Sequence, residues 1–354
     1  MKLSELDFDY PEDLVATERV SPSRTLLVDL GANSGHGAGA RELTRTQLLD
    51  LFGPGDLWVV NQTRVLKRRV FTKQNLEILF IKPLNAERTD WEVLCPSSRW
   101  KQGTQQTVGS VSLELTERGR PQKLRSSVSL FEDFFEEAGE LPLPPYIQKA
   151  RGERHTRTED DREYQSLWAE TPGSLAAPTA SFHFDDDFVS ELKKRGVEIA
   201  TVTLHVGLGT FLPVTVENLD DHVMHSEVAE ISKATQDAVT RTKKAGGRVI
   251  AVGTTVTRTL ESWAAGIFAQ NAASPDTSGT LRGETALLIR PGYEWKVVDV
   301  LLTNFHQPKS TLFALVAAFS DLESVRRAYS YAIENRFRLF SYGDLSVWMT
   351  ARDR

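Results

Sequence analysis

Residues 248–266 read RVIAVGTTVTRTLESWAAG, and this stretch decides the fold class. Its first half is apolar and β-branched, as in a buried strand, and its second half places apolar residues at helical spacing. The same alternation continues on both sides, with expected elements at helix 185–196, strand 197–206, helix 229–247, strand 296–305 and helices that begin at Ser310 and Leu322. Such alternation predicts an α/β fold built on a mainly parallel sheet with helices on both faces.

The N-terminal part of the chain is expected to add to this sheet. Residues 25–30 (TLLVDL) and 57–61 (LWVVN) read as strands, and residues 41–52 (RELTRTQLLDLF) between them have helical spacing. The glycine-rich residues 31–40 are expected to form a loop, because so many glycines cost too much conformational entropy inside a helix or strand. A second loop is expected at about 267–283. The chain is therefore predicted to open as strand, helix, strand.

A different pattern occupies residues 64–150. Short, often alternating runs separated by turn-forming residues extend to about residue 130 and indicate a small all-β unit, expected to form a barrel. A short acidic helix (131–140) and a polar connector (148–163) follow. The sequence therefore predicts a discontinuous α/β catalytic domain, residues 1–63 and 151–354, interrupted by an inserted β-barrel domain, residues 64–150.

The composition restricts the classes of function. A formal net charge of -6 over 354 residues argues against coating nucleic acid by bulk attraction, although two local basic stretches exist, at 64–73 and 149–157. Cys95 is the single cysteine, which excludes an intrachain disulfide and a cysteine-based zinc site. The acidic start lacks the apolar run of a signal peptide, and no apolar stretch approaches the roughly 18 residues of a membrane span. We therefore expect a cytoplasmic protein without a membrane partner.

Histidine, threonine, glycine and asparagine gather where three predicted strands end. The segments are TLHVGLGTF at 203–211, GTTVTRTLE at 253–261 and TNFHQPKST at 303–311. Each has an ordinary explanation on its own, such as a tight turn at the GxG or threonine capping of a helix. Ligands of open α/β sheets, however, bind in the crevice outside the carboxyl ends of the strands. Together the three segments therefore predict a ligand-binding crevice.

His222, His225 and Glu227 in HVMHSE raise the possibility of a metal site. Their spacing is not that of the HExxH helix, and no obvious further ligand completes a shell, so ligand binding or acid/base work is favoured and no metal is predicted. Walker, GxGxxG and GxSxG motifs are missing from the sequence. Their absence weakens nucleotide-hydrolysing, dehydrogenase and esterase interpretations.

Taken together, the motifs resemble those of the S-adenosylmethionine:tRNA ribosyltransferase-isomerase family of queuosine biosynthesis. The resemblance spans nearly the whole chain. It is carried by FDY at 8–10, PGDLWVVNQTRV at 54–65, PLPPYI at 142–147, EYQSLWA at 163–169, GSLAAPTASFHF at 173–184, TLHVGLGTFLPV at 203–214, HVMHSE at 222–227, RVIAVGTTVTRTLE at 248–261, LLTNFHQPKSTL at 301–312 and RLFSYGD at 338–344.

The resemblance implies that S-adenosylmethionine gives up its ribosyl group to 7-aminomethyl-7-deazaguanine at the tRNA wobble position. Adenine and methionine leave, and epoxyqueuosine forms. It implies an α/β body with an inserted β-barrel, the two substrates as partners, no obligate protein partner, and no metal or further cofactor. The sulfonium acidifies the hydrogens on the ribose 5′ carbon, so a positioned base must remove one, and adenine departure requires a proton donor.

The residues of the matching motifs then receive expected roles. The base that removes the proton is expected to be His205 or Glu227. His183 and His306 are expected to assist the leaving groups or to orient the ribose. The methionine carboxylate is expected to be held by Thr254, Thr255 and Arg258. The full set of residues assigned to substrate binding is Gly207, Gly209, Thr210, Thr254, Thr255, Arg258, His222, His225, Thr303, Asn304, Tyr342 and Asp344. A basic tRNA-binding surface at the domain junction is expected from Arg64, Arg68, Arg69 and Lys149.

The chain departs from the family where the first crossing between domains is expected. The family usually has NDTRV followed by an Ile-Pro-Ala-Arg-like run, whereas here Gln62 replaces the acidic residue and LKRR occupies 66–69. Gln62 suggests an alternative, a catalytically weak paralogue that binds tRNA or a nucleoside. A second alternative is a metal-dependent hydrolase that uses His222, His225 and Glu227. Adenine release from S-adenosylmethionine separates the three interpretations. The ribosyltransferase requires this release and the binding paralogue lacks it, and a chelator would abolish activity only in the hydrolase.

Overall fold

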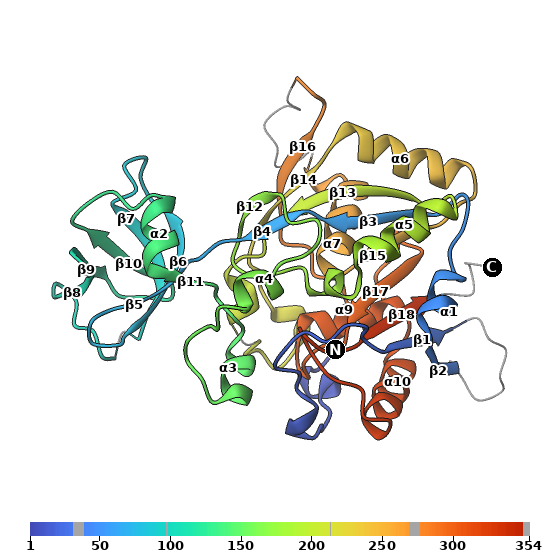
Figure 1. The fold of residues 1–354 in the computed structure, drawn as a ribbon, viewed down its shortest axis with the longest axis horizontal. Coiled ribbons are helices and arrows are strands. Elements are labelled where there is room, and N and C mark those ends of the chain that lie inside the picture. Colours follow the sequence, from blue (N-terminus) through green and yellow to red (C-terminus); the bar gives the residue numbers. More distant parts are fainter. Residues whose placement is uncertain (31–38, 97, 213, 269–276, 350–354) are drawn as a thin grey trace.

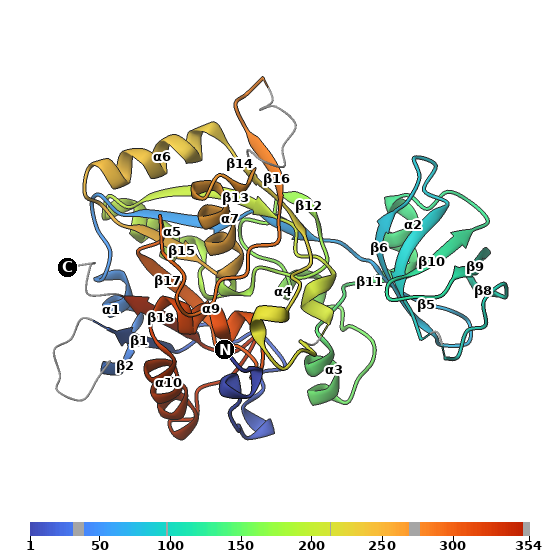
Figure 2. The same ribbon diagram turned by 180° about the vertical axis from the view of Figure 1, so that it is seen from behind.

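The computed structural model describes residues 1–30, 39–96, 98–212, 214–268 and 277–349 (Figure 1). A large body and a smaller lobe are visible, and the lobe projects from one side of the body in both views (Figure 2). A nine-stranded sheet forms the centre of the body, and a seven-stranded sheet forms the lobe. Within the described ranges, every helix is too short or too polar to traverse a lipid bilayer.

The nine-stranded sheet has the order β16-β14-β13-β3-β15-β17-β18-β1-β2. Its strands are β1 (Thr25–Asp29), β2 (Gly39–Leu43), β3 (Leu57–Asn61), β13 (Glu198–Leu204), β14 (Glu227–Ile231), β15 (Val249–Val252), β16 (Leu281–Thr285), β17 (Val300–Asn304) and β18 (Leu345–Met349). Four neighbouring pairs are parallel and four are antiparallel. The prediction of an α/β class is confirmed, but the expected mainly parallel sheet is not, because the strands flanking the parallel centre are largely antiparallel.

Helices cover both faces of this sheet, as predicted. One face packs against α1 (Arg45–Leu49) and α5 (Asp186–Lys194), with Trp58 in its core. The opposite face, whose core includes Val59, carries α6 (Lys233–Lys244), α7 (Thr254–Ala264), α9 (Thr311–Phe319) and α10 (Leu322–Glu334). Adjacent residues of β3 therefore point to opposite cores, as the pleat of a strand requires.

The predicted helix at 41–52 is shorter than expected because a capping residue sets its start. The Thr44 hydroxyl accepts the backbone N–H of Gln47 at 3.2 Å, and the Gln47 side chain accepts the N–H of Thr44 at 2.9 Å. This reciprocal capping box fixes the first turn after Thr44. The residues before it form β2 instead. The glycine-rich residues 31–38 lie outside the described part of the chain.

The predicted helix at 229–247 begins late for the same reason. The Ser232 hydroxyl accepts the backbone N–H of Thr235 at 3.1 Å and caps α6, which starts at Lys233. The residues before it alternate between buried and half-buried and form β14. The predicted loop at 267–283 likewise overlaps β16, which begins at Leu281, and residues 269–276 lie outside the described part.

The lobe is an antiparallel sheet of order β11-β5-β6-β7-β10-β9-β8 with its own apolar core. Its elements are β5 (Arg69–Phe71), β6 (Glu77–Pro83), β7 (Asp90–Leu94), β8 (Gln105–Val108), β9 (Val111–Glu117), β10 (Gln122–Ser126), α2 (Glu132–Ala138) and β11 (Gly139–Glu140). The ladders end at β11 and β8, and a hydrogen bond from Lys73 N to Thr107 O at 2.9 Å joins the segment after β5 to β8. The sheet is thus a curled half-barrel, and the expected closed barrel is not confirmed.

Two chain segments connect the lobe to the body. The outgoing segment contains β4 (Thr63–Val65), which pairs in parallel with β12 (Thr171–Ser174) beyond the return. The returning segment contains α3 (Pro145–Arg151) and α4 (Asp160–Glu163). A buried ion pair anchors it, since Arg151 donates to both oxygens of Asp160 at 2.7 and 2.8 Å. Short 3-10 helices complete the fold, η1 (Leu3–Leu6), η2 (Glu12–Leu14), η3 (Thr179–His183), η4 (Leu208–Phe211) and η5 (Leu219–Asp221).

Candidate active site

The parallel centre of the large sheet brings the predicted strand ends together. Strands β13, β3, β15 and β17 run in the same direction, so their carboxyl ends meet at one edge. Asn61, the last residue of β3, ties these ends to one another. Its Nδ2 donates to Leu204 O at 3.0 Å and to Thr255 Oγ1 at 3.2 Å, and its Oδ1 accepts the N–H groups of Leu204 and Thr63 at 3.1 Å. All four hydrogen-bonding capacities of this buried amide are used, which fixes the shape of the edge.

His205 follows β13 at this edge and has a defined ring position. Its Nδ1 lies 2.8 Å from Thr63 Oγ1, and its backbone N–H donates to Val228 O at 3.0 Å. One ring face lies against Gly173, where a Cβ would be only 2.6 Å from Cε1. Burial lowers the pKa of His205 below its usual value. Nε2 has no hydrogen-bond partner among the described residues, so this nitrogen can meet a ligand.

His183 lies in η3 and has partners at both ring nitrogens. Nδ1 is 2.6 Å from Ser23 Oγ, and Nε2 is 3.1 Å from Asn304 Nδ2. Asn304 in turn accepts the Thr179 hydroxyl at 2.8 Å. Burial, with smaller contributions from nearby arginines, lowers the pKa of His183 to about 3. The imidazole is therefore neutral. No local pattern predicts the contact with Ser23, which lies 160 positions away in the chain.

His306 follows β17 and is held in a similar way. Its Nε2 is 2.8 Å from Thr303 Oγ1, and its backbone N–H donates to the hydroxyl of Tyr329 at 2.8 Å. Burial lowers the pKa of His306 to about 3. The third predicted strand end thus supplies a neutral histidine beside a threonine hydroxyl, with Asn304 contacting His183 from the same strand.

Glu227 and Arg258 form a buried ion pair. Arg258 Nη1 donates to Glu227 Oε2, and the other carboxylate oxygen accepts the N–H of Gly207 at 3.0 Å. Arg258 Nε also donates to the carbonyl of Leu287 at 3.2 Å. Both charged groups are therefore engaged inside the protein. This pairing leaves Arg258 poorly available for a substrate carboxylate, and both oxygens of Glu227 already have partners.

Thr254 and Thr255 occupy the first turn of α7, as predicted from the sequence. The N-cap of this helix is Gly253 at φ +97°, and no side chain caps the helix. Its first N–H groups therefore lack a side-chain acceptor, which suits an anionic ligand. The Thr255 hydroxyl accepts Asn61 Nδ2, so it belongs to the network at the strand ends. The side chain of Thr210, another predicted binding residue, lies outside the described part of the structure.

His222 and His225 lie on the segment before β14. His225 is exposed and packs over Gly209, whose added Cβ would be 3.5 Å from the ring. Burial and the neighbouring His225 lower the pKa of His222. The part of the chain that the structure describes contains no group of three or more His, Cys, Asp or Glu residues placed to hold a metal. The hydrolase alternative therefore gains no support from His222, His225 and Glu227.

Tyr342 and Asp344 are buried and serve as anchors. The Tyr342 hydroxyl donates to Asp160 Oδ1 at 3.2 Å, which joins the C-terminal part of the chain to the connector. Asp344 accepts the backbone N–H groups of Arg24 at 3.1 Å and Arg338 at 2.7 Å. Burial raises the pKa of Asp344. Their contacts join parts of the protein to one another, and the expected contact with substrate stays a prediction.

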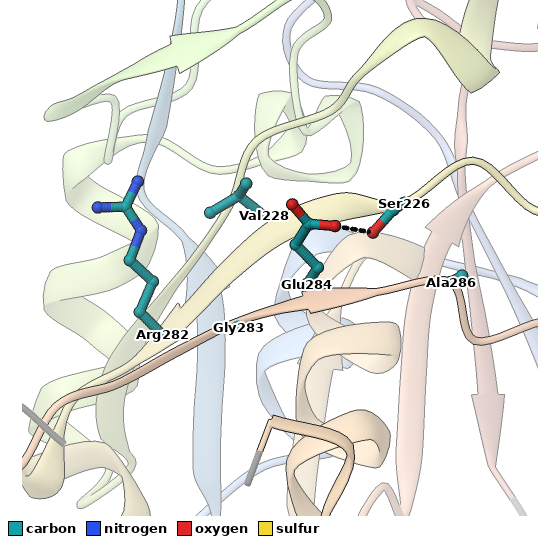
Figure 3. Close-up of a pocket in the computed structure, with 6 residues that line it drawn as sticks. All are labelled: Ser226, Val228, Arg282, Gly283, Glu284 and Ala286. Atoms are coloured by element: carbon teal, nitrogen blue, oxygen red, sulfur yellow. Dashed lines mark hydrogen bonds between the residues drawn. The ribbon is translucent and has the colours of Figure 1, made fainter. Parts of the chain in front are cut away.

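An open pocket of about 560 Å³ lies along β14 and β16 on the flank of the sheet (Figure 3). It is lined by Ser226, Val228, Arg282, Gly283, Glu284 and Ala286. Val228 stands opposite Glu284 in the β14–β16 ladder, and the adjoining β13–β14 register brings His205 opposite Val228. Residues directly opposite in antiparallel strands point to the same face. His205 therefore shares its face with this pocket. The pocket was not predicted from the sequence, because the second half of β14 was expected to be helical and the start of β16 to lie in a loop.

Comparison with known proteins identifies the family. Residues 3–347 match the family of the queuosine biosynthesis protein. The chain belongs to this family. A relative from Staphylococcus epidermidis is 41% identical, covering 97% of this chain and 98% of its own length, and one from Burkholderia mallei is 43% identical, covering 100% and 97%. Both are named S-adenosylmethionine:tRNA ribosyltransferase-isomerase. A crystal structure of S-adenosylmethionine tRNA ribosyltransferase from Thermotoga maritima is similar with a TM-score of 0.53 and 29% identity, covering 98% of this chain and 100% of that chain.

The departure from the queuosine family at Gln62 has a structural setting. Gln62 Nε2 donates to Thr203 Oγ1 at 3.2 Å and to Thr171 Oγ1 at 3.4 Å, and the Gln62 carbonyl accepts the N–H of Thr171 at 3.0 Å. The residue thus joins the exit of β3 to β13 and to the start of β12. A neutral amide can donate to these hydroxyls, whereas a carboxylate can only accept.

The expected basic surface of this family member is wrong for two of its four residues. Arg68 and Arg69 are 5% and 1% exposed and pair with Glu132 at 2.6 Å and Glu77 at 3.0 Å. Lys149 is exposed but pairs with a carboxylate at 2.7 Å. Arg64 is exposed, and its side chain has no ion pair or hydrogen bond within the described residues. Clustering in sequence did not produce a basic surface, because β5 turns Arg69 into the lobe and Arg68 lies over the ring of Phe135.

Proposed function

We propose that this chain transfers and isomerises the ribosyl group of S-adenosylmethionine onto 7-aminomethyl-7-deazaguanine in the tRNA anticodon. The products are epoxyqueuosine in tRNA, adenine and methionine. The observation that carries the proposal is the full-length similarity to relatives named for this activity, at 41% and 43% identity. The crevice at the strand ends supports it, because its polar groups lie where ligands of α/β sheets bind.

The reaction needs polar groups at the ribose of S-adenosylmethionine. One proton must leave the 5′ carbon next to the sulfonium, and the departing adenine must be stabilised. We assign contact with this ribose to His205, whose Nε2 has no partner in the described ranges. Glu227, the other expected base, is less suited because Arg258 and the Gly207 N–H engage both of its oxygens. The direction in which His205 moves a proton depends on which of its nitrogens carries hydrogen.

The remaining crevice residues would bind and orient. We propose that the first N–H groups of α7, at Thr254 and Thr255, bind the methionine carboxylate, because the helix N-terminus carries partial positive charge. His183 and His306 would orient the ribose as neutral imidazoles, since each is already held by a hydroxyl. No metal or further cofactor takes part in this proposal.

The proposal also concerns the domains and the second substrate. We propose that residues 1–63 and 151–354 form the catalytic domain and residues 64–150 an inserted domain, supported by separate sheets and separate apolar cores. The tRNA would approach at the junction, where Arg64 is exposed at the exit of the catalytic domain. Because the proposed substrate is tRNA, the enzyme would act in the cytoplasm.

Adenine release from S-adenosylmethionine tests the function. The purified chain is incubated with S-adenosylmethionine and tRNA that carries the 7-deazaguanine precursor, and adenine, methionine and modified tRNA are measured. Equimolar products are expected, unaffected by a chelator, and His205→Ala should lower the rate about 10²-fold or more. A folded chain that binds tRNA without releasing adenine would be the non-catalytic paralogue. Loss of activity with a chelator would instead support the metal-dependent hydrolase.

A further inference from the structure

We infer that Thr63 is a positioning residue that fixes the proton of His205 on Nε2, so that the neutral ring presents an N–H donor to the ligand. Thr63 belongs to one of the matching motifs, at 54–65, but no role was predicted for it from the sequence. The identity of the ligand rests on the proposed function. The tautomer itself is a property of the free protein.

The backbone on both sides of the Thr63–His205 contact is held by Asn61. Its side chain is fully buried, and its backbone N–H donates to Asn61 Oδ1 at 3.1 Å. The same Asn61 oxygen accepts the N–H of Leu204, the residue before His205, at 3.1 Å. Both partners are thus fixed from one amide. The distance from Thr63 Oγ1 to His205 Nδ1 is 2.8 Å.

The ring of His205 cannot turn away from this contact easily. Gly173 lies against one ring face, with an added Cβ predicted at 2.6 to 2.8 Å from three ring atoms. The backbone N–H of His205 donates to Val228 in the neighbouring strand at 3.0 Å. Nδ1 therefore faces Thr63, and Nε2 lies at the opposite end of the ring. The side of the sheet that carries His205 is also the side of the open pocket in Figure 3.

Counting hydrogens decides between the two neutral tautomers. The Thr63 hydroxyl carries one hydrogen, and among the described residues its one hydrogen-bonding partner is His205 Nδ1. If Nδ1 carried the ring proton, the hydroxyl hydrogen would remain buried without an acceptor, which is costly. If the hydroxyl donates to Nδ1, that hydrogen is satisfied and the ring proton sits on Nε2. We expect the second arrangement to prevail by on the order of tenfold or more.

The tautomer gives His205 a definite chemical role. A neutral imidazole with hydrogen on Nε2 has no lone pair there, so it cannot take the proton from the ribose 5′ carbon through that atom. It can donate a hydrogen bond to a ring nitrogen of adenine while the bond from the ribose to adenine breaks and negative charge develops on the base. Neutral histidine is an effective donor of this kind when it is preorganised.

Nitrogen NMR of the full chain without substrate tests the tautomer. The chain is labelled with ¹⁵N-histidine and compared with Thr63→Val, which keeps the shape of the side chain and removes the hydroxyl. The wild-type ring of His205 should show a protonated Nε2 and an unprotonated Nδ1. Thr63→Val should give a mixture, and Thr63→Ser should restore the wild-type pattern. Thr203→Val is the control, because the Thr203 hydroxyl is buried nearby and bonds to Gln62 instead of a histidine.

The kinetics of adenine release give the second readout. Thr63→Val should lower kcat about tenfold or more with KM for S-adenosylmethionine changed by less than about threefold, and Thr63→Ser should recover most of the rate. A wild-type ring protonated on Nδ1 would overturn the inference, as would a Thr63→Val spectrum equal to that of the wild type. If Thr63→Val does not fold, the wild-type spectrum alone decides. Absence of adenine release with the expected tautomer would refute the proposed function and leave the inference standing.

Discussion

Replacing Gly173 with alanine should displace the ring of His205 and remove most of the activity. The new Cβ would lie 2.6 Å from Cε1, 2.7 Å from Nδ1 and 2.8 Å from Nε2 of the ring. Since ordinary contacts between such atoms begin near 3.5 Å, the ring must retreat by about 0.8 Å. Because Gly173 lies against the ring face, this retreat is perpendicular to the ring, so it moves Nδ1 out of line with the Thr63 hydroxyl and weakens the 2.8 Å contact by misalignment. A catalytic group misplaced by roughly 1 Å costs on the order of 10²-fold in rate.

The variant should also lose some stability, so a matched control variant is needed. Overpacking at one site costs about 1–3 kcal/mol, and Gly173 also has φ +154°, a conformation that side chains rarely adopt. Gly292→Ala is the matched control, because Gly292 has φ +93° and no heavy atom within 4 Å of an added Cβ. Adenine release and urea unfolding are measured for both variants. A Gly173→Ala enzyme within threefold of Gly292→Ala in rate would refute the proposed role of the His205 ring position.

Three further outcomes follow from the same contacts. Arg258→Met leaves the buried Glu227 carboxylate without its partner, so the free energy of unfolding in urea should fall by about 3–5 kcal/mol, and a loss below 1 kcal/mol would contradict the pairing. Arg64→Glu should weaken tRNA binding and lower the slope of log affinity against log salt by about 1, whereas an unchanged slope would exclude a phosphate contact. His183 and His306 have pKa values of about 3 in the folded protein, below the usual 6.5. Their contribution to stability is therefore complete above pH 6.5 and is lost as the pH falls towards 3. By pH 5 each should lower the free energy of unfolding by roughly 2 kcal/mol, and the double variant to glutamine should not show this loss.

The parallel centre of the fold could be predicted from sequence because its signals are local. Strand β15 and helix α7 follow each other within one stretch, and the change from β-branched residues to helical spacing is visible there. The antiparallel flanks gave weaker signals. Strand β14 is five residues long and is followed directly by a helix, so its alternation was hidden within an apparent helical run. The start of that helix depends on one capping hydroxyl, at Ser232, which helical periodicity does not reveal.

The site could be predicted only as far as its residues lie at strand ends. His205 and Asn304 follow or end strands that are parallel neighbours of the central ones, so a crevice was expected from topology. Their partners could not be found in this way. Thr63 and Ser23 lie more than 140 positions from the histidines that they contact. Such pairs depend on tertiary packing, which no local pattern in one sequence specifies.

For the basic residues, a strong local pattern in the sequence led to a wrong prediction of their exposure. Arg68 and Arg69 stand side by side in a run of basic residues, which favours a surface for nucleic acid. Arg69 begins β5, and both arginines pack on aromatic rings of the lobe while pairing with its carboxylates. Long arginine side chains can be buried when rings and carboxylates receive them. Charge in sequence therefore gives no direct measure of charge on the surface.

The three histidines of the crevice share one kind of partner, and this choice suits the proposed substrate. His205, His183 and His306 each contact a hydroxyl group and none is paired with a carboxylate in the described structure. A carboxylate partner would raise an imidazole pKa, whereas with a hydroxyl partner burial remains the largest effect and lowers the pKa of each ring. The ring nitrogens therefore act as donors and acceptors without positive charge. S-adenosylmethionine carries a sulfonium cation, and imidazolium groups a few ångströms away would repel it. A crevice of neutral, hydroxyl-bound histidines can surround this cation without that repulsion.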